Sequence, residues 1–415
     1  MKDTQTKPYL VAEQAVRKAY KRVKRNQGAE GIDQVSITDF EKNLEGNLYK
    51  IWNRMSSGSY FPPAVKQVEI PKEKGQVRKL GIPTVADRVA QMVTKLYLEP
   101  IIEPKFHDHS YGYRPKRSAL DAVRTAKKRC WRSPWVIDID IKGFFDHLNH
   151  DLMVKALRFH TRNPWINLYV MRWLKAPIYT TEGSMEYKDE GSPQGSVISP
   201  LLANLFMHHA FDDWMRRNYS YIQFERYADD MVVHCKSRKQ AEMILSVIIK
   251  RLKQCLLNLH PHKTKIVYCL NGQQKVNGAP ICFDFLGFTF QPRCAQSRHG
   301  NLFVGYLPGI SQKAQRRIHE TIRSWKLTSS KLLWSLNNLA NLINPFIRGW
   351  INYFGIGYKK PLRLILDDVN RALTRWARKR YKRFNRSLFK ARQWLRAISE
   401  RDPNLFYMWH LNVKP

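Results

Sequence analysis

Two adjacent acids lie in the middle of a segment that otherwise has the pattern of a largely buried strand, "FERYADDMVVHC". Successive side chains of a β-strand point to opposite faces, so Asp229 and Asp230 lie on one side only if the chain turns there. A tight turn within "ERYADDMVV" would place both carboxylates at the tip of a hairpin. The segment therefore predicts either a hairpin with a solvated acidic tip or a site where a cation relieves the repulsion between the two acids.

A second acidic segment favours the cation site. In "WVIDIDI", the alternation of a short strand places Asp138 and Asp140 on one face. Asp140, Asp229 and Asp230 could together hold two Mg²⁺ ions, because Mg²⁺ prefers oxygen ligands and completes its shell with water and substrate phosphates. Two such ions clamp the attacking and leaving oxygens of a phosphoryl transfer. We expect Asp140 to be the third ligand and Asp138 to support it.

Other acids and histidines are weaker candidates for a site. His147 and His150 are three residues apart, and His208 and His209 are adjacent, but no neighbouring Cys, His or Glu completes a metal-binding set. A zinc role is therefore not expected. The sequence also shows no Ser-His-Asp signature and no phosphate-binding Walker loop. Three acids are expected to cap helices or to remain exposed: Asp146, Asp212 and Asp213.

The net charge points to a polyanionic partner. The chain has 71 Lys and Arg against 34 Asp and Glu, a formal net charge of +37. Such an excess destabilises a compact protein through self-repulsion unless a polyanion offsets it, so nucleic acid is the expected partner. A membrane is not, because there is no run of eighteen apolar residues and no lipidation motif. With no secretion signal and no CxxC pair among six cysteines, we expect a cytoplasmic, nucleoid-associated protein.

The order of predicted elements favours an α+β fold. Residues 1–60 have a helical pattern, and residues 61–305 alternate strands and helices without the regular rhythm of a parallel sheet. Residues 306–415 are helical and strongly basic, with tryptophans interleaved among the bases. These changes in pattern predict three parts with the boundaries just given.

Several motifs, in their order and spacing, resemble those of one family. "DIDIKGFFDHLNHDL", "GSPQGSVISPLLANL", "RYADDMVV", "HPHKTKIVY" and "FDFLGFTF" resemble successive blocks of the reverse transcriptases encoded by bacterial group II introns, which are also maturases. "VEIPKEKGQVRKLGIP" and "SYGYRPKRSALDAV" resemble the fingers of that family. "LINPFIRGWINYFG" and "RDPNLFYMWH" resemble its thumb and maturase region. The resemblance covers nearly the whole chain.

This resemblance implies a right-hand polymerase with mixed fingers, an antiparallel-sheet palm and a helical thumb. Residues 1–60 would be an N-terminal extension, residues 61–305 the fingers and palm, and residues 306–415 the thumb and RNA-binding maturase domain. The implied activity is RNA-directed DNA polymerisation, a nucleotidyl transfer supported by two Mg²⁺ ions, with Mn²⁺ able to substitute. The implied partners are group II intron RNA, an RNA template with a DNA primer, dNTPs and target DNA; the oligomeric state is left open.

The resemblance also implies roles for individual residues. Asp140, Asp229 and Asp230 match the catalytic, metal-binding acids. The residues that match the nucleotide-binding positions are Lys72 and Arg78 at the triphosphate, Phe145 under the sugar, Gln194 near the nucleotide and template, and Lys263 near the leaving pyrophosphate. The residues that match primer- or RNA-binding positions are Phe285, Leu286, Gly287 and Arg348. Each has a plainer alternative: solvated surface for the basic residues, core packing for Phe145 and for the "FLGF" segment.

Two further expectations concern the thumb and the end of the chain. Apolar residues of "NPFIRGWINYFG" should form the packed face of a helix whose opposite face is basic: Phe346, Ile347, Trp350, Ile351 and Phe354. Many members of the family continue into a Cys-bearing nuclease region, which this sequence does not show before Pro415. Homing endonuclease activity is therefore not expected, and DNA insertion would use a primer made elsewhere.

Three rival functions remain open at this point. The first is a maturase that folds intron RNA while its polymerase site is idle. The second is a reverse transcriptase domesticated for phage defence or associated with CRISPR. The third is an RNA-dependent RNA polymerase, which a bulky Phe145 under the sugar argues against.

Overall fold

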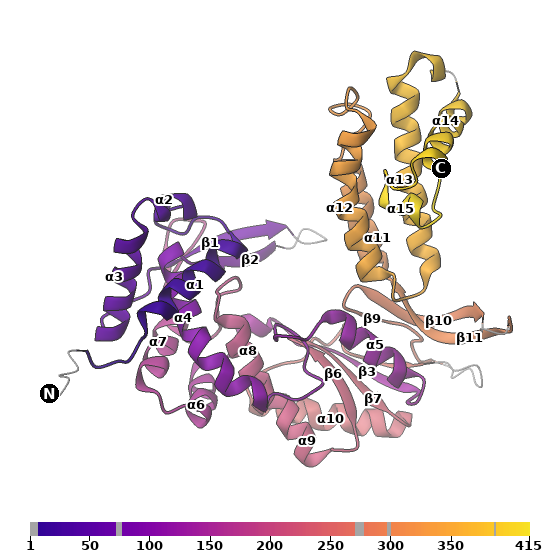
Figure 1. Cartoon of the computed structure of the whole chain (residues 1–415). Helices are drawn as coiled ribbons and strands as arrows, with labels where there is room; N and C mark the ends of the chain where they lie inside the picture. Colours follow the sequence, from indigo (N-terminus) through magenta and orange to yellow (C-terminus); the bar gives the residue numbers. More distant parts are fainter. Residues whose placement is uncertain (1–6, 72–76, 270–277, 297–299, 386) are drawn as a thin grey trace. The chain divides into compact units, whose positions relative to one another are not determined.

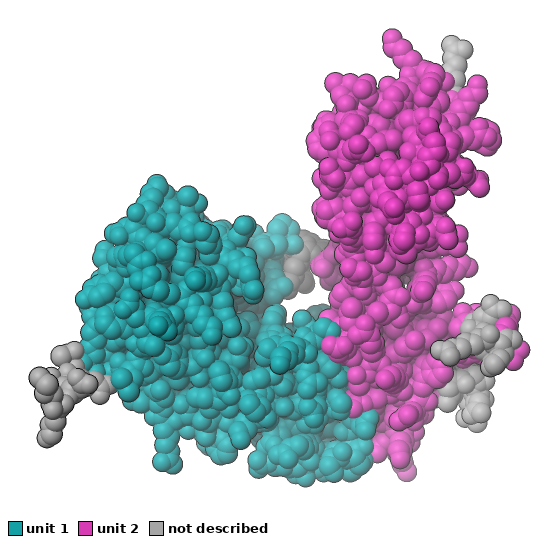
Figure 2. Space-filling model, in the orientation of Figure 1, with its two compact units in different colours: residues 1–118, 139–233, 242–264 teal, residues 119–138, 234–241, 265–415 magenta. Residues whose placement is uncertain are grey.

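The chain folds as an α+β protein that divides into two compact units, seen here in a computed structural model (Figures 1 and 2). The structure describes residues 7–71, 77–269, 278–296, 300–385 and 387–415. Unit 1 comprises residues 1–118, 139–233 and 242–264, and unit 2 comprises residues 119–138, 234–241 and 265–415. The division follows packing and does not test the functional boundaries at residues 60 and 305, which stay a prediction.

Helix α4 (Val85–Ile102) is the buried centre of the N-terminal part of unit 1. Helix α1 (Glu13–Asn26) packs against α4 through Val16, Ala19, Tyr20 and Val23, a spacing that forms one apolar stripe. Unit 1 also contains α2 (Ile37–Glu41) and α3 (Leu44–Ser57), which lie where residues 1–60 show a helical pattern, together with α6 (His150–His160) and α7 (Pro164–Leu174).

A four-stranded sheet in unit 1 has the order β2-β1-β4-β5. Its strands are β1 (Val65–Pro71), β2 (Val77–Ile82), β4 (Ile178–Tyr179) and β5 (Met185–Glu186), with β1 and β2 antiparallel. The end of β2 lies against the loop of residues 191–196, where Gly81 N donates a hydrogen bond to Gln194 O at 2.7 Å. A Cβ at Gly195 would lie 2.6 Å from Gly81 O, so this close approach requires glycine.

A second four-stranded sheet carries the acids and has the order β6-β7-β3-β8. Its strands are β3 (Trp135–Asp140), β6 (Gln223–Tyr227), β7 (Asp230–Cys235) and β8 (Lys265–Tyr268), with β3 and β8 antiparallel. The helical elements that follow the 191–196 loop are α8 (Ser199–Met207), a π-helical turn (His208–Asp212) and α9 (Asp213–Asn218). Helix α10 (Arg238–Gln254) comes directly after β7.

Unit 2 combines a three-stranded sheet, in the order β11-β10-β9, with a group of helices. The strands are β9 (Phe283–Phe285), β10 (Phe288–Gln296) and β11 (Leu302–Ile310), and α5 (Ala119–Cys130) packs on β11. The remaining helices are α11 (Gln312–Ser324), α12 (Leu336–Phe354), α13 (Lys359–Arg380), α14 (Leu388–Arg401) and α15 (Tyr407–His410). Helix α13 packs against α11, α12 and α14 (Figure 1).

The packed face of α12 differs from the predicted one. Ile347 and Phe354 are buried as expected, but Phe346 is 41% exposed and Trp350 only half-buried. The buried stripe instead extends toward the start of the helix through Leu339, Ala340 and Ile343. The prediction was wrong here because the "NPFIRGWINYFG" motif covers only the second half of a longer amphipathic helix.

In the described part of the chain, no helix is both long and apolar enough to cross a membrane.

A buried ion pair supports the turn between β6 and β7. Both partners, Arg226 on β6 and Asp212 at the end of the π-helical turn, have fully buried side chains. The guanidinium of Arg226 donates Nε at 2.7 Å and Nη2 at 2.6 Å to the two carboxylate oxygens of Asp212. Its remaining hydrogen bonds reach Ser110 Oγ, Asn204 Oδ1 and Ala228 O, at 2.7, 3.0 and 3.0 Å. All five N–H donors of the guanidinium are thus used, one of them on the turn itself.

The same turn is held from the side by residues 109–112. Arg226 N donates to His109 O at 2.9 Å, and Tyr111 N donates to Arg226 O at 2.8 Å. A Cβ at Gly112 would lie 2.6 Å from Ala228 N, so only glycine permits this approach of backbone to backbone. Asp212 was expected to cap a helix or to remain exposed, and this prediction is wrong. Asp213 is also largely buried and pairs with Arg216 and Arg217, whereas Asp146 is exposed as expected.

A second buried network connects α4 to the 191–196 loop. Asp87 is 1% exposed and accepts hydrogen bonds from Tyr60 Oη at 2.9 Å, Trp173 Nε1 at 2.8 Å and Gln91 Nε2 at 2.9 Å. Gln91 Oε1 in turn accepts from Ser196 Oγ at 2.6 Å. Burial outweighs these hydrogen bonds and raises the pKa of Asp87 to about 6. The network holds one end of the loop that contains Gln194.

We predict that Asp87 lowers the stability of the native protein as pH rises. Between pH 3.8 and about 6, the native state retains a proton that the unfolded chain releases, so the free energy of unfolding falls across this window. A shift of this size corresponds to about 3 kcal/mol. In urea unfolding from pH 4 to pH 7, the wild type should therefore lose stability relative to the Asp87→Asn variant. A constant difference in stability between the wild type and Asp87→Asn across this range would contradict the prediction.

We also predict that Arg226→Met strongly destabilises the protein. The substitution leaves the Asp212 carboxylate buried without its partner, which typically costs about 3–5 kcal/mol. Urea unfolding followed by circular dichroism measures the loss. The double variant Asp212→Leu/Arg226→Met, which removes both charges, should recover part of the stability. The matched control is Arg124→Met, at an exposed ion pair with Asp121, which should change stability little. If Arg226→Met and Arg124→Met lowered the free energy of unfolding equally, the buried ion pair would not stabilise the protein more than an exposed one does.

Candidate active site

The three predicted acids lie on neighbouring strands. Strand β6 ends at Tyr227 and β7 begins at Asp230, so Ala228 and Asp229 form a two-residue turn. Ala228 has a φ of 59°, the left-handed conformation that tight hairpin turns require. Asp140 is the last residue of β3, the strand next to β7. The predicted hairpin turn is confirmed, and Asp140 ends the adjacent strand.

The electrostatics of Asp229 link several of the predicted residues. Burial raises the pKa of Asp229, and the charge of Asp140 raises it further, while Arg78 and Lys263 lower it. Lys263 Nζ lies 3.3 Å from both carboxylate oxygens of Asp140. Asp140, Arg78 and Lys263 are therefore near enough to Asp229 to act on its charge. Among the described residues, no three carboxylates have oxygens that all lie within 4.8 Å of one another. Such close spacing is not required when the carboxylates share two metal ions that are themselves about 3.5–4 Å apart.

Asp138 takes part in a different pair. Its carboxylate lies 3.7 Å from Lys265 Nζ on the neighbouring strand β8, and its side chain is mostly buried. This pair connects β3 to β8 at the register position where Asp138 and Lys265 face each other. The role expected for Asp138, support of the metal site, stays a prediction.

The predicted nucleotide-binding residues Arg78, Gln194 and Phe145 are joined through one loop. Arg78 Nε, on β2, donates a hydrogen bond to Gln194 Oε1 at 2.6 Å. Ser192 N, in the same loop, donates to Phe145 O at 2.8 Å, and the Phe145 ring is 7% exposed. Both bonds fix the loop between the β1–β2 hairpin and the segment that follows β3. Lys72 lies outside the described residues.

The predicted primer-binding segment is a tight hairpin turn in unit 2. Leu286 and Gly287 connect β9 and β10, with φ of 51° and 81°. The turn is held by Tyr353 Oη, which donates to Leu286 O at 2.8 Å. Phe285 is fully buried, so its side chain packs in the core. A role of this turn in positioning the primer end stays a prediction. Leu286 and Gly287 remain at the surface.

Arg348 lies on the exposed side of α12, as predicted. Its guanidinium carbon is 5.2 Å from the centre of the Tyr407 ring, a cation–π contact that orients the side chain. The side chain remains accessible to a polyanion.

Sequence reasoning missed the residues that hold the site in place. Arg226 lies inside the quoted "RYADD" motif, and Gln91 lies in a segment recognised only as helical. Nothing local marks either side chain as buried and fully bonded. The available signal for Arg226 was its alternation with Phe224 along the strand, which places both side chains on the same face.

Comparison with known proteins matches this chain to two described families. Residues 70–290 match the family described as reverse transcriptase (RNA-dependent DNA polymerase), and residues 315–394 match the group II intron maturase-specific domain. The chain is 31% identical over 343 residues to the protein YkfC of Escherichia coli (strain K12), a match that covers 74% of this chain and 84% of YkfC.

Two other similarities are more limited in extent or identity. The chain is 32% identical over 203 residues to the group II intron-encoded protein LtrA of Lactococcus lactis subsp. cremoris, covering 48% of this chain and 33% of LtrA. A solved structure of telomerase from Candida albicans aligns with a TM-score of 0.46 at 11% identity, covering 91% of this chain and 68% of that chain.

The family match spans the strands that bear the acids, the loop with Gln194 and the hairpin with Arg78. The maturase match falls on the helices of unit 2. The resemblance noted from the motifs is thereby confirmed. The chain belongs to the group II intron reverse transcriptase and maturase family, and it is an RNA-directed DNA polymerase.

Proposed function

We propose that the chain copies group II intron RNA into cDNA by extending a DNA primer with dNTPs, and that it assists the splicing of that RNA. The observation that carries the proposal is the meeting of Asp140 and Asp229 beside two cations, Lys263 and Arg78. Acids that hold metal and bases that hold phosphate are the two components that a nucleotidyl transfer requires.

The donor set fits a hard divalent cation. All three candidate ligands are carboxylates, and the buried Asp229 carries a raised pKa partly because Asp140 is close. A bound cation would offset this repulsion, so Asp140, Asp229 and Asp230 would hold two Mg²⁺ ions, or Mn²⁺ in their place. The charge that develops on the transferred phosphoryl group would be stabilised by ions bound there.

The chain's own residues would bind and select the nucleotide. Arg78 uses one of its five donors on Gln194, a bond that fixes the plane of the guanidinium so that its other donors can bind the triphosphate. Lys263 would place a positive charge near the leaving pyrophosphate. Phe145, held through its backbone by Ser192, would exclude a ribose 2′-hydroxyl.

The basic surface would bind RNA and DNA largely through phosphates. Helices α11 to α14 contain the maturase match and carry exposed bases, Arg348 among them, that could hold intron RNA or the template–primer duplex, with Leu286 and Gly287 near the primer. Contacts to target DNA would belong to the same surface. Such binding weakens steeply as salt increases. These partners would place the protein at the nucleoid of a bacterial cytoplasm.

We predict that Asp229→Ala abolishes primer extension on an RNA template. Removal of a metal-binding carboxylate should lower the rate by at least about 1,000-fold, the upper range for loss of one preorganised electrostatic group. The matched control is Asp151→Ala, an exposed acid on α6, which should extend at the wild-type rate. Binding of intron RNA should be unchanged in both. If Asp229→Ala extends as well as the control, the protein acts on RNA without this polymerase site.

We predict that Phe145→Val weakens discrimination against rNTPs. A smaller side chain would admit the 2′-hydroxyl, so the ratio of kcat/KM for dNTP over rNTP should fall by about tenfold or more, equivalent to about 1.4 kcal/mol. Phe144→Val is the matched control, because its ring packs against Phe145 at a centroid distance of 5.2 Å and is also buried. A similar fall in both variants would indicate a general packing defect rather than a contact to the sugar.

A further inference from the structure

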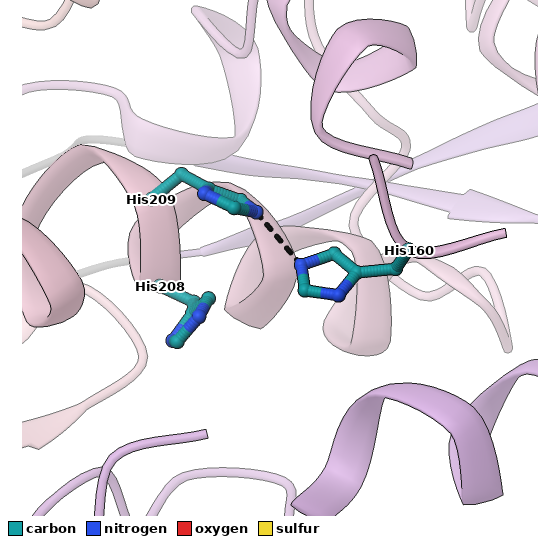
Figure 3. Close-up of side chains that lie close together, drawn as sticks. All are labelled: His160, His208 and His209. Atoms are coloured by element: carbon teal, nitrogen blue, oxygen red, sulfur yellow. Dashed lines mark hydrogen bonds between the residues drawn. The ribbon is translucent and has the colours of Figure 1, made fainter. Parts of the chain in front are cut away.

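Three histidines from two segments of unit 1 converge, and none of them is among the predicted catalytic residues (Figure 3). His160 is the last residue of α6, and His208 and His209 open the π-helical turn. One ring nitrogen from each lies within 4.8 Å of the other two, and Nε2 of His160 is 2.8 Å from Nε2 of His209. The expectation that no third residue completes a set with His208 and His209 is therefore wrong, because the third ligand comes from another helix.

The His208 ring has a nitrogen without a partner. His208 is 8% exposed, and its Nδ1 atom is buried without a hydrogen bond within the described protein. A buried polar atom that lacks a partner costs about 1–3 kcal/mol, so such atoms in native proteins call for an explanation. A ligand bound to the ring would supply one.

The protonation state of the cluster suits a metal. Burial is the largest cause that lowers the pKa of all three imidazoles, that of His208 to about 4. Burial disfavours the charged imidazolium, and neutral imidazole is the form that binds a metal ion. Lys105 lowers the pKa of His160, while the Asp213 carboxylate acts in the opposite direction on all three rings.

The surrounding space has room for a fourth ligand. The histidines line a cavity of about 440 Å³ whose wall also includes Asp213, Arg216 and Arg217. Asp213 is engaged by both arginines, at 2.5 and 2.7 Å, so it supplies charge nearby rather than a free ligand. A water molecule is the fourth ligand that this cavity offers, as in zinc sites with three protein ligands.

We propose that His160, His208 and His209 form a binding site for a divalent transition-metal ion, Zn²⁺ foremost. Imidazole ligands select this class of ion over Mg²⁺, which takes oxygen ligands. Tetrahedral Zn–N bonds of about 2.05 Å place ligand nitrogens about 3.3 Å apart. The His160 and His209 nitrogens need to separate by only a few tenths of an ångström from their 2.8 Å hydrogen bond.

The backbone at the site is of an uncommon kind. The π-helical turn is a rare conformation that often occurs at functional sites. It is held by Arg251, which donates to His209 O at 2.9 Å and to Ala210 O at 3.1 Å. The turn begins at His208 and ends at Asp212, the partner of Arg226. A metal at the histidines would join the end of α6 to this turn and stabilise the support of the β6–β7 turn.

The test uses the full, tag-free chain stripped of metal, titrated with Zn²⁺ in excess Mg²⁺ against a chromophoric chelator. We expect each chain to bind one Zn²⁺ ion tightly. The X-ray absorption spectrum of the bound zinc should show three imidazole ligands. Loss of even an outer hydrogen bond typically costs 10–100-fold in metal affinity, so His160→Asn and His209→Asn should each weaken binding by at least about 100-fold. Zn²⁺ should raise the Tm of the wild type but not of these variants.

The matched control is His410→Asn, an exposed histidine on α15, which should bind Zn²⁺ as the wild type does. Zinc bound at the catalytic acids instead would show oxygen ligands and be insensitive to the histidine substitutions. That result, or wild-type protein without a three-imidazole spectrum, would overturn the proposal and leave a hydrogen-bonded histidine pair. Circular dichroism confirms that the variants are folded.

Discussion

The geometry of the active site depends on one buried cation. Arg226 brings a full charge into the interior and is stabilised there because every donor of its guanidinium has a partner. Removing a charge from water is energetically unfavourable, and this desolvation is offset only when the buried charge is fully paired and hydrogen-bonded. This requirement ties β6, the π-helical turn, α8 and residues 109–112 to a single point. The left-handed Ala228, and with it Asp229, is held because its carbonyl is one of those partners.

Charge is distributed in opposite ways at two scales. The whole chain carries a formal net charge of +37, which suits a protein that binds polyanions. At the β6–β7 turn, acids are concentrated instead, and burial together with Asp140 opposes the ionisation of Asp229. Lys263 and Arg78 flank these acids and partly offset the repulsion. The acids at the turn would bind metal ions, and the surrounding basic residues would bind phosphates. Both kinds of binding are required for the proposed nucleotidyl transfer.

Hydrogen-bond networks carry this arrangement beyond the catalytic strands. Asp87 and Gln91 on α4 hold the loop that presents Gln194, and Gln194 in turn orients Arg78 on β2. On the other side, the π-helical turn connects the histidine cluster to Asp212. The predicted nucleotide-binding residues Gln194 and Arg78 are therefore positioned by buried polar groups on other elements.

Local pattern was sufficient for part of the site. The "ADD" segment predicted a tight turn because alternation would otherwise separate its acids, and β3 followed from the period-2 pattern of "WVIDIDI". The family motifs, which are also contiguous in sequence, predicted the fold and the position of Arg78. Such signals report on residues that are neighbours along the chain.

Long-range packing decided the rest. Asp212 was expected to cap a helix or to remain exposed, because only the folded chain brings Arg226 to it. For Phe285, the sequence left primer positioning and core packing both open, and the fold places its side chain in the core. His160 could not be assigned to His208 and His209, since 48 residues separate it from His208 and the end of α6 meets the π-helical turn only in three dimensions. Sequence alone thus determined the family and the turn that carries the adjacent acids. Tertiary structure decided which charges are buried and paired, because burial depends on elements that are far apart in the chain.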